Sequence, residues 1–124
     1  MDKGDPSHAA CRNLLERHRG PLFVPVLVVA EVAYLVQRQS GSQNELRFLT
    51  NLVVGTYEAI GLEEADWVRT GELVATYQDL RLGTVDASVV ALAERLKITQ
   101  IATLDRKHFS VVRPNHVEAF ELLP

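Results

Sequence analysis

Three acidic residues stand where an ionised carboxylate is energetically unfavourable, which makes them candidates for chemistry. Glu31 lies in an apolar stretch, and in a helix its neighbours one turn away would all be largely apolar. Asp86 is followed three and four residues later by valines, and Asp105 directly follows the apolar segment that ends at Leu104. An unpartnered carboxylate in such surroundings costs several kcal/mol or takes up a proton, so each of the three needs a cation nearby.

Each of these residues, taken singly, also has an ordinary explanation. Glu31 can be a surface glutamate or one half of a buried salt bridge, Asp86 can be a first-turn partner of a helix dipole, and Asp105 can be a capping residue. The three together favour a site, because carboxylates gathered at one sheet edge repel one another unless a cation or protons offset their charge. The carboxyl edge of a parallel sheet is also where ligands bind in open α/β domains.

A ligand set made only of oxygens predicts Mg²⁺ or Mn²⁺ as the cofactor. The chain has a single cysteine, Cys11, and its 4 histidines show no metal-ligand spacing, which argues against zinc. Two such cations, roughly 4 Å apart, activate water and stabilise the leaving oxygen of a phosphodiester. We therefore predict that Glu31, Asp86 and Asp105 are both metal ligands and catalytic residues of a hydrolytic site.

Helical and strand signals alternate along the chain, which is typical of an α/β domain with a mostly parallel sheet. Pro25 stands where the first turn of a helix tolerates proline, and Thr84 is a plausible N-cap before Asp86. Glu63, Glu64 and Asp66 are expected to form a solvated helix start. The expected helices cover residues 8–18, 26–39, 43–53, 63–80 and 85–96, and the expected strands cover residues 22–24, 57–60, 98–104 and 117–122.

Composition limits the class of protein. With 124 residues, 47% hydrophobic and 23% charged, the chain is expected to form one globular domain over residues 1–124. No apolar run reaches the roughly 18–20 residues that span a bilayer, and a lone cysteine suits a reducing compartment, so we predict a cytoplasmic protein. No glycine-rich phosphate loop occurs, which disfavours a nucleotide-binding domain.

Basic residues gather at two places, although the net charge of −3 argues against a chain that is coated in nucleic acid as a whole. Such groups are often only solvated faces. If the fold brings them to the rim of the site, they would contact phosphates. The candidates for such phosphate contacts are Arg12, Arg17, Arg106, Lys107 and His108.

The segments that carry the three carboxylates resemble the PIN domain. They read VVAEVAYL over residues 28–35, GTVDA over residues 83–87 and ATLDRKHF over residues 102–109. The likeness is strongest to the ribonuclease toxins of bacterial VapBC toxin–antitoxin pairs and covers almost the whole chain. It implies a three-layer sandwich with a mostly parallel sheet and helices on both faces.

The resemblance also implies a function. Glu31, Asp86 and Asp105 match three of the family's acidic residues, and Thr84 resembles a small polar residue often found close to the site. The implied activity is endonucleolytic cleavage of RNA with Mg²⁺ or Mn²⁺, which makes the basic residues named above candidates for RNA binding. The implied partners are an RNA substrate, a small antitoxin protein that blocks the site, and a second copy of the chain in a homodimer.

One departure from the family concerns its first, central strand, which ends in an aspartate and has no counterpart here. Asp2 and Asp5 belong to a segment that resembles the family's loop after that strand and its short helix, so neither is taken as the missing ligand. Two interpretations stay open. The chain is expected to be N-terminally truncated relative to the family, either because the true start lies upstream of Met1 or because the chain is a decayed or regulatory fragment. The alternative function is a catalytically impaired PIN-like module that binds an antitoxin without cutting RNA.

Overall fold

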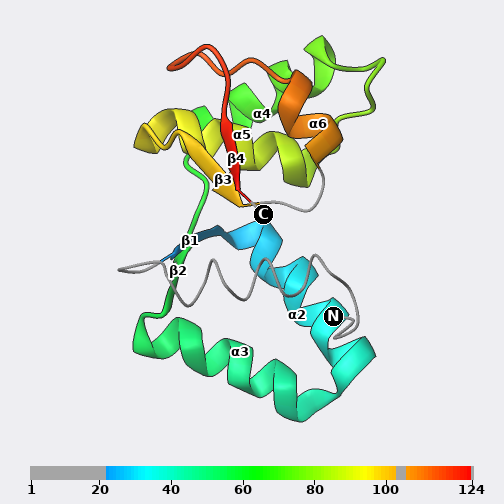
Figure 1. Cartoon of the computed structure of the whole chain (residues 1–124), viewed down its shortest axis with the longest axis vertical. Coiled ribbons are helices and arrows are strands. Elements are labelled where there is room, and N and C mark those ends of the chain that lie inside the picture. The colour runs from blue at the N-terminus through cyan, green and yellow to red at the C-terminus, as the bar shows by residue number, and fades with distance from the viewer. Residues whose placement is uncertain (1–21, 103–105, 124) are drawn as a thin grey trace. The chain divides into compact units, whose positions relative to one another are not determined.

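The structure, a computed structural model, describes residues 22–102 and 106–123. The chain divides into two compact units, Met1–Gly61 and Leu62–Pro124 (Figure 1). None of the helices in the described ranges is both long enough and apolar enough to cross a membrane. The expected helix over residues 8–18 lies outside the described residues.

The first unit contains a parallel pair of strands joined by a helical hairpin. Strand β1 (Leu22–Pro25) pairs with β2 (Tyr57–Ile60), with Leu22 opposite Tyr57. Between them run α2 (Val26–Ser40) and α3 (Ser42–Val54). Gly41 and Gly55 end these helices with φ of 87° and 90°, a conformation that glycine adopts without steric penalty. Neither of the two helices, described over their full lengths, contains a fully buried residue.

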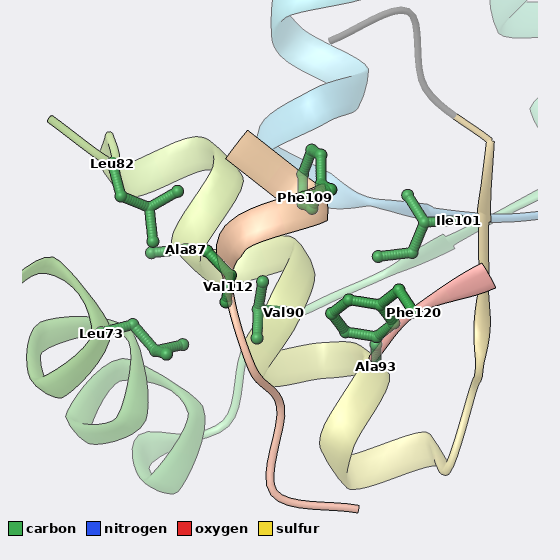
Figure 2. Packing of buried hydrophobic residues seen from close by; sticks show 9 residues of the cluster. All are labelled: Leu73, Leu82, Ala87, Val90, Ala93, Ile101, Phe109, Val112 and Phe120. Atoms are coloured by element: carbon green, nitrogen blue, oxygen red, sulfur yellow. The ribbon is translucent and has the colours of Figure 1, made fainter. Parts of the chain in front are cut away.

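The second unit packs helices against a second parallel strand pair. Its elements are α4 (Glu64–Thr76), α5 (Thr84–Leu96), β3 (Gln100–Ala102), α6 (Arg106–Val111) and β4 (Glu121–Leu123). Strands β3 and β4 pair in parallel, with Gln100 opposite Glu121. Figure 2 shows the buried apolar cluster between these elements, which consists of Leu73, Leu82, Ala87, Val90, Ala93, Ile101, Phe109, Val112 and Phe120.

Helix α5 is the central element of this cluster and ends in a Schellman motif. Its buried side includes Ala87, Val90 and Ala93, whose spacing of three residues places them on one helical face. Lys97 adopts a left-handed φ of 59°, and the Ile98 N–H donates to the Ala93 carbonyl at 2.8 Å. The motif stops the helix and turns the chain toward β3.

The predicted elements are largely present, but α6 was not expected, β3 begins two residues later than expected, and four further details differ. The four strands of the described ranges form two separate parallel pairs. The helix expected over residues 63–80 ends at Thr76, because the chain turns at Tyr77, whose hydroxyl accepts the Arg113 N–H at 2.9 Å. The last strand pairs only over Glu121–Leu123. The expectation for Thr84 is wrong: Gly83 is the N-cap and Thr84 is the first helical residue.

Candidate functional site

Asp86 lies in the first turn of α5, in agreement with the helix expected over residues 85–96. Val90, four residues on, is fully buried, and Val89 is half-buried, so this side of the helix faces the core. The Asp86 side chain itself is 32% exposed. The first turn of a helix stabilises negative charge through its free N–H groups. Asp86 is therefore an ionisable group at the boundary between core and solvent, which suits a cation ligand.

The Asp86 carboxylate is in contact with His108, which belongs to α6. The distance from His108 Nδ1 to Asp86 Oδ2 is 3.2 Å, and the His108 side chain is 21% exposed. Two residues that follow the histidine hold α6 in place, since Phe109 and Val112 are buried in the apolar cluster. His108 was predicted from the sequence as an RNA contact; the structure places one of its ring nitrogens beside a predicted metal ligand.

Glu31 lies on α2, in the first unit, and its side chain is exposed. Of the four neighbours one turn away, Leu27 and Val28 are half-buried, whereas Tyr34 and Leu35 are 59% and 41% exposed. The apolar surroundings expected for Glu31 are thus present on one side only. Among the described residues Glu31 forms no ion pair.

Several predicted residues lie beyond the part of the chain that the structure describes. Asp105, Arg12 and Arg17 are outside the described residues. Arg106 and Lys107 open α6, so their backbone is placed, but their side chains are not described. Thr84 is exposed at the start of α5, two residues before Asp86. The roles predicted for these residues stay predictions.

The donor chemistry of the candidate ligands fits Mg²⁺ or Mn²⁺. All three are carboxylates, and small hard cations prefer oxygen ligands. His108 engages Oδ2 of Asp86, so Oδ1 is the oxygen left to face a cation. Within residues 22–102 and 106–123 no group of three or more potential ligands is gathered, and Asp105 is not among those residues.

A second polar cluster lies near the C-terminal end of α5, and the sequence did not predict it. The side chain of Asp66 is only 4% exposed and accepts a hydrogen bond from Arg95 Nε at 2.9 Å. Arg69 contacts Glu94 at 2.8 Å, and Glu94 also accepts the Asn115 N–H at 2.8 Å. Asp66 does lie in the first turn of α4, but the expectation that it is solvated is wrong, because its carboxylate is buried and paired with Arg95 of α5.

The pKa of Glu94 predicts a pH dependence of stability for this cluster. Burial alone would raise the pKa of Glu94, but hydrogen bonds from Arg69 and the Asn115 N–H, together with the charge of Arg69, lower it below its ordinary value of 4.5. A carboxylate whose pKa is lower in the folded state stabilises the fold above the unfolded pKa and loses that contribution as pH falls through the folded pKa.

We therefore expect Glu94→Gln to be less stable than the natural chain at neutral pH, with the difference shrinking below about pH 4.5. Denaturant unfolding at a series of pH values measures this difference. The Glu118→Gln variant, in which an exposed glutamate loses its charge, is the matched control and should show no such trend. A Glu94→Gln deficit that stays constant or grows toward acid pH would contradict the assignment.

Comparison with known proteins identifies the class to which this fold and site belong. Residues 1–113 match the family model described as PIN domain. The chain therefore belongs to the PIN-domain family, and the resemblance inferred from the three acidic motifs is confirmed.

The chain is similar to two proteins from Mycobacterium tuberculosis, one in sequence and one in fold. It is 37% identical over 124 residues to Ribonuclease VapC26, an alignment that covers 100% of this chain and 92% of the relative. Its fold is similar to that of VapC20, whose crystal structure is described as that of a sarcin–ricin loop cleaving toxin. The TM-score is 0.76 and the sequence identity is 15%, and the match covers 86% of this chain and 82% of that chain. The α/β fold predicted from the sequence is thus a PIN-like fold.

Proposed function

We propose that this protein is a metal-dependent endoribonuclease and the toxin of a toxin–antitoxin pair. The observation that carries the proposal is the 37% identity to Ribonuclease VapC26 along the whole chain. The half-buried Asp86 at the start of α5 supports it, because the residue has the position and chemistry of a metal ligand. We further propose that the two compact units act as one PIN domain, which the family match over residues 1–113 supports.

The proposed site consists of Glu31, Asp86 and Asp105, which would hold Mg²⁺ or Mn²⁺ through their carboxylate oxygens. When bound, the cation supplies Lewis-acid activation of water and of the phosphoryl oxygen. The protein's part is to fix the carboxylates and to orient the RNA backbone. Thr84, which is exposed in the first turn of α5 two residues before Asp86, would offer a hydroxyl as a further hydrogen-bonding group.

Basic side chains would hold the RNA by its phosphates. The backbone of Arg106 and Lys107 opens α6, the helix that carries His108 and directly follows Asp105 in the sequence. Contacts of this kind are independent of base sequence and weaken with rising salt. We propose the same role for Arg12 and Arg17.

The proposed protein partners are an antitoxin and a second copy of the chain, and the proposed compartment is the cytoplasm. The first unit presents apolar side chains to solvent along α2 and α3, which supports a partner protein on these helices. The most exposed of them are Tyr34 at 59%, Leu46 at 63%, Val53 at 86% and Val54 at 68%.

Metal removal tests the proposed activity. Purified protein is expected to cut RNA in the presence of Mg²⁺ or Mn²⁺, to lose that activity when EDTA is added in excess, and to regain it when Mg²⁺ is restored. Cleavage is followed on end-labelled RNA, so that internal cuts are distinguished from trimming. Cleavage that persists in EDTA would contradict the metal-dependent mechanism. Tight antitoxin binding without cleavage under any metal condition would favour the impaired binding module instead.

A further inference from the structure

The contact between His108 and Asp86 joins two elements that the chain separates widely. The two residues are 22 positions apart, and the 3.2 Å distance joins His108 Nδ1 to Asp86 Oδ2. Both side chains are partly shielded from water, with 21% and 32% exposure. A hydrogen bond in such a setting orients its partners more firmly than one on an open surface, because water competes less.

The elements that carry the two residues are fastened to each other by the apolar cluster. Ala87 and Val90 of α5, Phe109 of α6, and Val112, which directly follows α6, are all buried within it. Figure 2 shows Val112 beside Val90, with Ala87 close by. Since Phe109 directly follows His108 in the sequence, burial of its ring limits where the imidazole can lie. The packing therefore presents the imidazole to Asp86.

The chemistry of the two groups determines the direction of the hydrogen bond. An ionised carboxylate only accepts, so Nδ1 must carry the proton, and a neutral His108 must be the Nδ1–H tautomer. The bond occupies one carboxylate oxygen and limits rotation of the Asp86 side chain. Groups that orient a metal ligand in this way typically change metal affinity or activity by about 10–100-fold when removed.

We propose that His108 is a positioning residue, which donates from Nδ1 to hold the Asp86 carboxylate in the orientation that binds the metal. The inference rests on the proposed function, because it takes Asp86 as a metal ligand. It assigns His108 a task that differs from the phosphate contact predicted from its basic neighbours.

Two substitutions separate this task from a general effect on folding. In His108→Asn the side-chain amide nitrogen can take the place of Nδ1, so the donor is kept, whereas His108→Ala removes it. We expect His108→Ala to weaken Mn²⁺ binding, measured by calorimetry without RNA, by about 10–100-fold and His108→Asn by at most about threefold. His116→Ala, which removes another histidine of the second unit, is the control and should leave Mn²⁺ affinity unchanged. Melting curves of all three variants check that each is folded.

The ring itself gives an independent signature. In the metal-free natural chain at alkaline pH, where an imidazole is neutral, nitrogen NMR should show His108 protonated at Nδ1. Protonation at Nε2 would overturn the proposal, and so would equal Mn²⁺ affinities of His108→Ala and the natural chain. Equal loss in His108→Asn and His108→Ala would overturn the role assigned to the Nδ1 donor.

The same measurements distinguish failure of this inference from failure of the proposed function. A natural chain that binds Mn²⁺ at Asp86 but cuts no RNA would refute the proposed activity and leave the role of His108 standing. A natural chain that binds no Mn²⁺ would refute both. Normal Mn²⁺ binding and RNA cleavage in His108→Ala would refute the role of His108 alone.

Discussion

Asp86→Asn is expected to slow Mg²⁺-dependent RNA cleavage by about 10³-fold or more. A bound metal contributes several kcal/mol to transition-state stabilisation, and each loss of about 1.4 kcal/mol lowers the rate tenfold. The substitution keeps the size and shape of the side chain and removes its negative charge, so the metal loses an anionic ligand while α5 keeps its packing. The residue lies at the helix start and is 32% exposed, so the fold should tolerate the change. Single-turnover cleavage rates at saturating Mg²⁺ measure the effect.

The matched control is Asp79→Asn, which removes the same charge from an exposed aspartate of the same unit. It should cut RNA at the natural rate. Both variants should have melting temperatures close to that of the natural chain. Cleavage by Asp86→Asn at the natural rate, with Mg²⁺ as the only divalent metal, would rule out Asp86 as a ligand.

Asp66→Ala is expected to lower the free energy of unfolding by about 2–4 kcal/mol. The carboxylate is 4% exposed and accepts hydrogen bonds from Arg95 Nε at 2.9 Å and from the Glu63 N–H at 2.8 Å. Removing one partner of a buried ion pair costs about 3–5 kcal/mol. Arg95 is 29% exposed and also contacts Glu63, so water and that second carboxylate reduce the loss. Urea unfolding followed by circular dichroism measures the difference.

Asp79→Ala is the control for this stability measurement, since surface substitutions usually change stability by less than about 0.5 kcal/mol. An equal, small effect of both substitutions would show that the contact between Asp66 and Arg95 does not stabilise the second unit. Because Asp66 and Arg95 lie outside the proposed site, folded Asp66→Ala protein at low temperature should still cut RNA.

Elements with a strong local pattern were predictable from the sequence. Glu31 does lie in a helix that begins after Pro25, and Asp86 does lie in the first turn of a helix that ends near Leu96. Both predictions rest on apolar spacing at helical period and on residues that favour helix starts, which are properties of neighbouring residues. The short strands β1 and β2 were predictable from apolar or β-branched runs bounded by breakers.

Features that depend on distant partners were not predictable in this way. Helix α6 has only 6 residues, and its basic start resembles a solvated loop; it forms because Phe109 and Val112 reach the apolar cluster. Asp66 resembled a surface residue because Arg95, its partner, is 29 positions away. The contact of His108 with Asp86 had no sequence signal for the same reason. Such pairs are brought together by packing, and spacing alone does not reveal them.

The most direct test of the shared metal site is a crystal structure of the protein grown with Mn²⁺, with anomalous diffraction locating the metal. We expect an anomalous peak at coordination distance, about 2.1 Å, from carboxylate oxygens of Glu31, Asp86 and Asp105. A structure in which these three carboxyl groups lie far apart, or point separately into solvent with no metal between them, would contradict the proposed mechanism.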